Sequence, residues 1–472
     1  MTSGLNFWDI DVWTFVITLS ILFGGMLVAN ALRRKVPFLR KSLIPSSVLG
    51  GFLILGVNAV YKLIFGSSMF SLATMEALTY HGLGLGFVAL AWRNTGSAKG
   101  KKAKRDVFST STVVVGAYLI QALAGLVISI ALFYLIGSFA GSGVILPMGY
   151  GQGPGQALNW GNIYQNNWGF EYGASFGLTV AAMGFVSASV GGVYYLNRMR
   201  RNGDPRAQIA NAEEIEDLNA TRITEKGEIP MAESLDKFTV QFAIIFVTYA
   251  VSFALMWAVS LGLDKLGGFW ANTVKPLIWG FNFLVGTAVA ILGKKIFGGF
   301  RSYGVISRSY TNDFMLNRTS GLMFDIMVTA SIAAIDLSAF KHKEFVLPLI
   351  LICAAGFFVT YFYCKFLCPK LFPEYSDDAF LSLFGMLTGT ASTGIILLRE
   401  IDPLFETPAS HNLIYQNLWA ILLGFPMLLL MGIVPQSITM TWICFGGIIA
   451  LFAGICFIQS RLFRSVKRDK AG

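Results

Sequence analysis

The long apolar runs are the feature that most limits what this chain can fold into. Several of them exceed 18 residues and carry few or no charges, and an α-helix of about that length can cross the hydrocarbon core of a bilayer. The chain is 55% hydrophobic and only 13% charged, whereas a soluble domain carries about 25% charged residues. The sequence therefore predicts an all-α polytopic membrane protein.

The apolar runs predict about eleven transmembrane helices and two further segments that enter the membrane without crossing it. The expected spans cover roughly residues 12–32, 46–64, 77–92, 107–137, 172–197, 238–262, 271–293, 319–339, 345–366, 411–434 and 440–460. The expected re-entrant segments cover roughly residues 143–168 and 379–407.

Lysine and arginine lie mostly in alternate loops between these spans. The loops on one side, together with the C-terminal tail, hold 30 of the 36 basic residues, and the loops on the other side hold five. Because basic residues concentrate in cytoplasmic loops, we expect the N-terminus outside and the C-terminus in the cytoplasm. Placement in loops also argues against nucleic acid as a partner, although the net charge is +10.

With that orientation the two halves of the chain cross the membrane in opposite directions. Each half, residues 1–197 and 238–434, has four spans, a re-entrant hairpin and a fifth span. We therefore expect two inverted five-helix repeats, an arrangement that many transporters share. A polar cytoplasmic linker at 198–237 joins them, and residues 435–472 add an extra span and a basic tail.

The first re-entrant segment contains five glycines and a proline within residues 148–161. Both residue types break helices, and unpaired backbone at membrane depth must be buried in protein or line a wet cavity. The spacing does not match the dinucleotide motif G-x-G-x-x-G, and a packed turn is the other alternative. We favour a hairpin tip whose half-helix N-terminus attracts an anion. The expected substrate-binding residues are Gly151, Gln152, Gly153, Pro154, Gly155, Gln156 and Asn159.

The second broken segment, residues 387–394, places four hydroxyl side chains among glycines. Hydroxyls and unwound backbone carbonyls coordinate small cations in broken helices; alternatively, the hydroxyls bond back to their own helix. The expected substrate contacts are Thr390 and Ser392, and the expected ion ligands are Thr388, Gly389, Ser392 and Thr393.

Charged residues inside expected membrane segments are candidates for function. Asp325 in the eighth span is an expected ion ligand or proton carrier, with pairing at the cytoplasmic interface as the alternative. Arg399, Glu400 and Asp402 follow the second broken segment and reach either a cavity or the interface.

The sequence carries no H-E-x-x-H, G-x-S-x-G or P-loop motif, so we expect neither an enzyme nor a cofactor. Its five cysteines lie in or beside apolar runs, which favours buried small side chains over a metal site.

Three stretches resemble the bacterial sodium/glutamate symporter family. Residues 44–51 resemble its Ile-Pro-x-x-Val-x-Gly-Gly motif. Residues 151–157 resemble its Gly-His-Gly-Thr-Gly-Ala-Ala motif, with Gln152 and Pro154 in place of the His and the Thr. Residues 389–393 resemble its Gly-Ala-Thr-Pro-Thr motif, and Leu397 stands where the family has Asn.

The resemblance implies a sodium-coupled symporter in the bacterial inner membrane, usually a homodimer, that imports glutamate or a related amino acid. One bundle would carry the site across the membrane against a dimerising scaffold, with lipid around both. Proton-coupled uptake of a carboxylate through Asp325 is the first alternative. An ion channel, which would share paired re-entrant loops, is the second.

Overall fold

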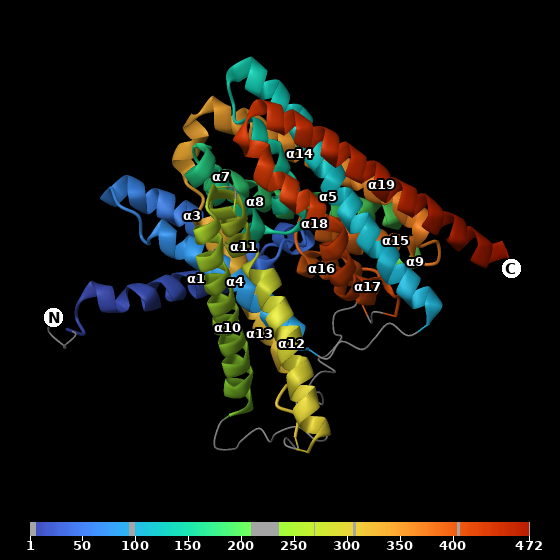
Figure 1. Cartoon of the computed structure of the whole chain (residues 1–472), viewed down its shortest axis with the longest axis horizontal. Helices are drawn as coiled ribbons and strands as arrows, with labels where there is room; N and C mark the ends of the chain where they lie inside the picture. The colour runs from blue at the N-terminus through green and yellow to red at the C-terminus, as the bar shows by residue number, and fades with distance from the viewer. Residues whose placement is uncertain are drawn as a thin grey trace. The chain divides into compact units, whose positions relative to one another are not determined.

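The computed structural model describes residues 6–93, 100–208, 236–268, 270–304, 308–403 and 406–471, and the secondary-structure elements within these ranges are all helices (Figure 1). Nine of the described helices are long and apolar enough to cross a membrane. They are α1 (Ile10–Lys35), α3 (Ser46–Phe65), α5 (Lys101–Ile136), α8 (Gly173–Arg201), α10 (Lys237–Leu266), α12 (Asn282–Ser302), α14 (Lys343–Leu371), α18 (Asn417–Ile433) and α19 (Ile438–Ala471). The prediction of an all-helical polytopic membrane protein is confirmed.

Two further long helices occupy the positions expected for the third span of each half. They are α4 (Leu72–Trp92) and α13 (Asp313–Ala333). Neither contains an apolar stretch comparable to those of the nine, because polar residues such as His81 and Asp325 interrupt them. The count of eleven spans therefore stays a prediction.

Two expected spans are interrupted. The span expected at 271–293 is broken at Phe281, between the short α11 (Lys275–Gly280) and α12. The span expected at 411–434 starts as a separate short helix, α17 (Ala409–Tyr415), before α18. The remaining short elements are α2 (Pro37–Lys41), α9 (Pro205–Gln208), the 3-10 helices η1 (Ala140–Ile145), η5 (Leu337–Lys341) and η6 (Val434–Gln436), and the π-helix η4 (Trp270–Val274).

The chain divides into two compact units that do not coincide with its two halves. The larger unit takes residues 1–79, 98–210 and 328–472, and the smaller unit takes residues 80–97 and 211–327. The expected linker therefore contributes to both units, and most of it, residues 209–235, lies outside the described residues.

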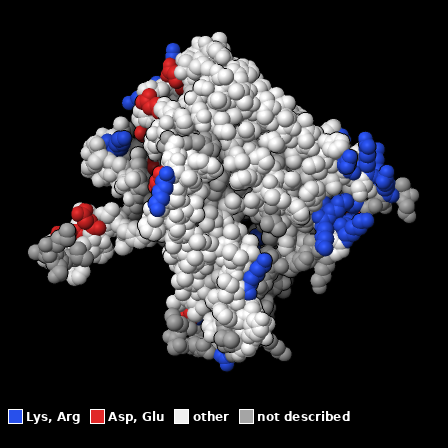
Figure 2. Space-filling view, in the orientation of Figure 1, with Lys and Arg blue, Asp and Glu red and all other residues white. Residues whose placement is uncertain are grey.

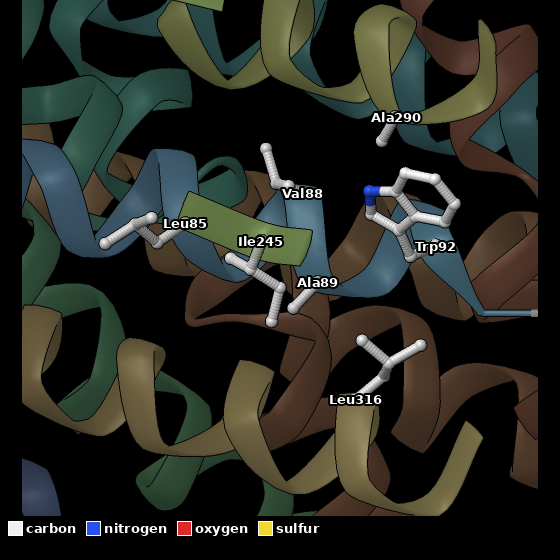
Figure 3. Packing of buried hydrophobic residues seen from close by; sticks show 7 residues of the cluster. All are labelled: Leu85, Val88, Ala89, Trp92, Ile245, Ala290 and Leu316. Atoms are coloured by element: carbon white, nitrogen blue, oxygen red, sulfur yellow. The ribbon is translucent and has the colours of Figure 1, made fainter. Parts of the chain in front are cut away.

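The smaller unit has its own apolar core (Figure 3). Trp92 of α4 packs there with Ile245 of α10, Ala290 of α12 and Leu316 of α13. The indole nitrogen of Trp92 donates a 2.9 Å hydrogen bond to Thr248, so the buried polar atom of this large side chain is satisfied.

In the larger unit, α5, α8 and α14 each contact both expected re-entrant segments. α5 packs against α14, α18 and α19, and its Gly125 lets the backbone of η1 approach at Gly143. Basic side chains gather where α19 ends and α5 begins (Figure 2), and Val466 of α19 lines a small pocket with Lys102 of α5. The two basic ends therefore lie on the same side of this unit.

Candidate functional site

The first expected re-entrant segment is a pair of helices with a sharp break between them. α6 (Leu146–Gly151) ends one residue before Gln152, and α7 (Pro154–Trp168) begins directly after Gly153. Gly153 has φ +83° and ψ −178°, a conformation that is essentially restricted to glycine. Pro154 then occupies the first position of α7, where its missing N–H costs nothing. We call residues 152–153 the first break.

The second expected re-entrant segment has the same construction. α15 (Ser376–Thr388) ends before Gly389, and α16 (Ala391–Arg399) begins after Thr390. Gly389 has φ −136° and ψ −104°, and Thr390 is extended. Residues 389–390 form the second break.

The two breaks meet inside the larger unit. A β-carbon added at Gly153 would lie 3.3 Å from the Cγ2 atom of Thr390 and 3.9 Å from the carbonyl oxygen of Gly389. The helices that follow, α7 and α16, therefore begin at neighbouring points, and neither has a side-chain cap. Because a helix N-terminus carries free N–H groups and about half a positive charge, two of them together favour an anion.

α5 holds both breaks from one face. The hydroxyl of Tyr118 donates to the carbonyl of Gly151 at 3.2 Å, and the amide of Gln121 donates to the carbonyl of Leu387 at 3.0 Å. Sequence reasoning did not identify Tyr118 or Gln121, because both lie within the apolar run of the fourth expected span.

α8 and α14 support the breaks from other directions. Gly184 of α8 has no side chain, so the carbonyl of Thr388 lies directly against its Cα. Tyr150 of α6 is fully buried; its hydroxyl is hydrogen-bonded to Ser187 of α8 and donates to the carbonyl of Cys353 in α14 at 2.8 Å. Through these contacts each broken segment is buried against neighbouring helices, as non-helical backbone at membrane depth must be.

The expected substrate-binding residues fall into a buried group and an accessible group. Gln152 and Thr390 are partly exposed and Ser392 is exposed, so a ligand can reach them. The side chains of Gln156 and Asn159 are buried within the larger unit. The backbone at Gly151, Gly153, Pro154 and Gly155 is buried as well.

The expected ion ligands are divided between the units. Thr388, Gly389, Ser392 and Thr393 lie at the second break in the larger unit, whereas Asp325 lies on α13 in the smaller unit. The hydroxyl of Thr388 bonds back to the Phe384 carbonyl at 2.6 Å, which matches the alternative of a helix-local role for that hydroxyl.

The hydroxyl of Thr393 is placed differently. It lies 3.4 Å from that of Thr390, and the Thr393 side chain is only 1% exposed. In the described part of the chain, no three His, Cys, Asp or Glu side chains form a metal-binding group. The second break presents the neutral hydroxyl oxygens of Thr390 and Thr393 close together.

Asp402 organises the loop that follows the second hairpin. Its carboxylate accepts hydrogen bonds from the N–H of Glu406 at 2.8 Å and from the N–H and hydroxyl of Thr407. Asp402 therefore has a structural role in this loop. Glu400, two residues earlier, lies 4.0 Å from the guanidinium of Arg200.

Arg206 binds the base of the second hairpin. Its guanidinium pairs with Asp204 at 3.0 Å, with Asp377 at 2.9 Å and with Asp378 at 3.1 Å. Tyr195 of α8 donates to Asp377 at 2.7 Å. The hydrogen bonds from Arg206 lower the pKa of Asp204 below its ordinary value. The start of the linker is thus tied to the start of α15.

Comparison with protein families identifies one match. The family model described as sodium/glutamate symporter matches residues 9–265, which is more than half of the chain. Comparison with curated proteins and with solved structures gives no match. The matched region includes the first break with α5 and α8, and the second break lies beyond it.

Proposed function

The chain belongs to the sodium/glutamate symporter family, and on that premise we propose that it imports glutamate or a related amino acid together with sodium. The observation that carries the proposal is the meeting of the two breaks. Gly153 lies against Thr390, so two uncapped helix N-termini converge at one place. A substrate carboxylate bound there receives backbone N–H groups and two favourable helix dipoles.

The accessible polar side chains around the breaks fit this substrate. Gln152 and Ser392 can donate hydrogen bonds to a second carboxylate or accept them from an ammonium group. Glycine at position 153 lets the ligand come close to the backbone. The first break supplies most of the substrate site in this proposal, and Thr390 and Ser392 complete it.

Sodium binds at the second break in this proposal. The hydroxyls of Ser392 and Thr393 and the carbonyls near Gly389 supply neutral oxygen ligands. Because Ser392 belongs to both sites and Thr390 lies between the ion ligands, ion binding and substrate binding share one segment of backbone. A bound ion that orders this segment raises the affinity for substrate, and linkage requires the reverse effect to be equal.

The transport cycle proposed here moves the two breaks together. The larger unit contains both breaks and carries the site across the membrane, while a scaffold holds the protein as a homodimer. In this proposal the N-terminus faces outward and the C-terminus faces the cytoplasm of a bacterium, and the inward sodium gradient drives substrate inward across the inner membrane.

Uptake into proteoliposomes tests the proposal. Purified protein should accumulate labelled glutamate above its equilibrium concentration when a sodium gradient points inward, and replacing sodium by choline should abolish the accumulation. Uptake driven by a proton gradient without sodium would overturn the assignment of sodium as the coupling ion. Equilibration without accumulation would indicate a channel, and selective uptake of another acid from a panel of amino and dicarboxylic acids would overturn glutamate as substrate.

A further inference from the structure

Gln121 makes an unusual set of contacts for a side chain in the middle of an apolar helix. It is fully buried, and its amide nitrogen donates to the hydroxyl of Thr360 at 2.7 Å and to the carbonyl of Leu387 at 3.0 Å. Leu387 lies two residues before the second break. One amide thus connects α5, α14 and the end of α15.

The orientation of this amide follows from its partners. A backbone carbonyl can only accept a hydrogen bond, and the Thr360 hydroxyl donates its hydrogen to the carbonyl of Gly356 at 2.7 Å. Both groups therefore face the nitrogen of Gln121, and its oxygen has no hydrogen-bond partner among the described residues. A buried amide oxygen without a partner is unfavourable for stability, so packing alone does not account for glutamine here.

Tyr118 lies three residues earlier, on the same face of α5. It holds the carbonyl of Gly151 beside the first break while Gln121 holds that of Leu387 beside the second. We propose that Gln121 is a positioning residue: its amide clamps the Leu387 carbonyl to α5 and thereby sets where the second break stands against the first. This inference rests on the proposed symport function, because the clamped backbone leads directly into the residues assigned to sodium and substrate.

The chain offers a matched control in Gln459 of α19. This buried glutamine also donates two hydrogen bonds, to the carbonyl of Thr112 in α5 at 2.9 Å and to the hydroxyl of Tyr363 in α14 at 2.8 Å. It joins α5 and α14 as Gln121 does, but neither of its partners lies at a break. Gln459→Leu therefore reports the cost of losing a buried amide between these helices without moving either break.

The test compares Gln121→Leu with Gln459→Leu in sodium-driven uptake and thermal unfolding. Gln121→Leu should raise the half-saturating sodium concentration about tenfold, because the buried Leu387 carbonyl beside the second break loses its hydrogen bond. Gln459→Leu should lower the melting temperature comparably and leave that concentration within about twofold. Equal, unchanged sodium dependence in both variants would overturn the proposal. If Gln121→Leu does not fold, Thr360→Val loosens the same amide, and an unchanged sodium dependence in that variant would overturn it as well.

A second measurement does not depend on transport and therefore separates failure of the Gln121 clamp from failure of the proposed function. If the unmodified protein shows no sodium-dependent uptake, the proposed function fails by itself. The clamp is then tested by the reaction rate of a cysteine placed at Ser392, an exposed position. Gln121→Leu should change this rate at least about threefold, as expected for a loosened contact of this kind, and Gln459→Leu should not. No change with Gln121→Leu would overturn the clamp.

Discussion

Replacing Gly153 by alanine tests the geometry of the first break directly. The native φ of +83° with ψ of −178° lies in a region that costs any other residue about 1–3 kcal/mol. The added methyl would also approach the Cγ2 atom of Thr390 to 3.3 Å, so that neighbour must yield by a few tenths of an ångström. The strain therefore acts at the point where the two breaks meet.

The magnitude follows from population arithmetic. If the strain shifts the break out of its binding geometry, the apparent affinity falls in proportion to the fraction of protein that stays in the binding-competent state. A cost of about 1–3 kcal/mol corresponds to about a 5- to 140-fold higher half-saturating substrate concentration. Sodium-driven uptake titrated with substrate measures this directly, and thermal unfolding of the same preparations measures stability.

Gly169 at the other end of α7 provides the control. Its φ of +70° and ψ of 23° are also unfavourable for alanine, by about 1–2 kcal/mol, but nothing lies within 4 Å of an added β-carbon. Gly169→Ala should lower the melting temperature and leave half-saturation within about twofold. If Gly153→Ala behaves in the same way, the first break is only a packed turn and the reasoning is wrong.

Three further expectations follow. Thr393→Ala and Ser392→Ala should each raise the half-saturating sodium concentration several-fold, because one lost ligand is worth roughly 1 kcal/mol. The half-saturating substrate concentration should shift less. If neither variant changes the sodium titration, these two residues are not ion ligands. Arg206→Gln should lower the melting temperature at neutral pH by an amount equivalent to roughly 1 kcal/mol or less. Arg206 lowers the pKa of Asp204, so its contribution to stability is present above pH 3.8, the ordinary pKa of aspartate, and is lost as the pH falls through the lowered pKa of Asp204. A difference in melting temperature between variant and parent that persists in acid would contradict this account. A cysteine at Ile215 should react only with reagents on the cytoplasmic side, and labelling from outside would overturn the inverted-repeat topology.

The sequence located the helices and the two breaks because these features have local causes. Long apolar runs specify spanning helices, and Gly153 with Pro154 marks a helix break within a few residues. The second break was visible because Gly389 also interrupts a helical pattern. Such signals require no knowledge of distant parts of the chain.

The arrangement around the breaks could not be predicted because it depends on distant residues. Gly153 lies against Thr390, and nothing near either residue in the sequence specifies that meeting. Gln121 is a single polar side chain in an apolar run, and its partner Leu387 is 266 residues away. The helix break at Phe281 was missed as well, because the apolar pattern continues through it.

Protection of the two breaks by substrate tests the central claim, that they form one sodium-coupled anion site. Of the five cysteines, only Cys456 is exposed, so Cys456→Ser gives a background for single cysteines at Gln152 and Ser392. Glutamate should slow thiol labelling at both positions when sodium is present, and much less when choline replaces it. Protection at only one position, or at neither, would contradict a shared site.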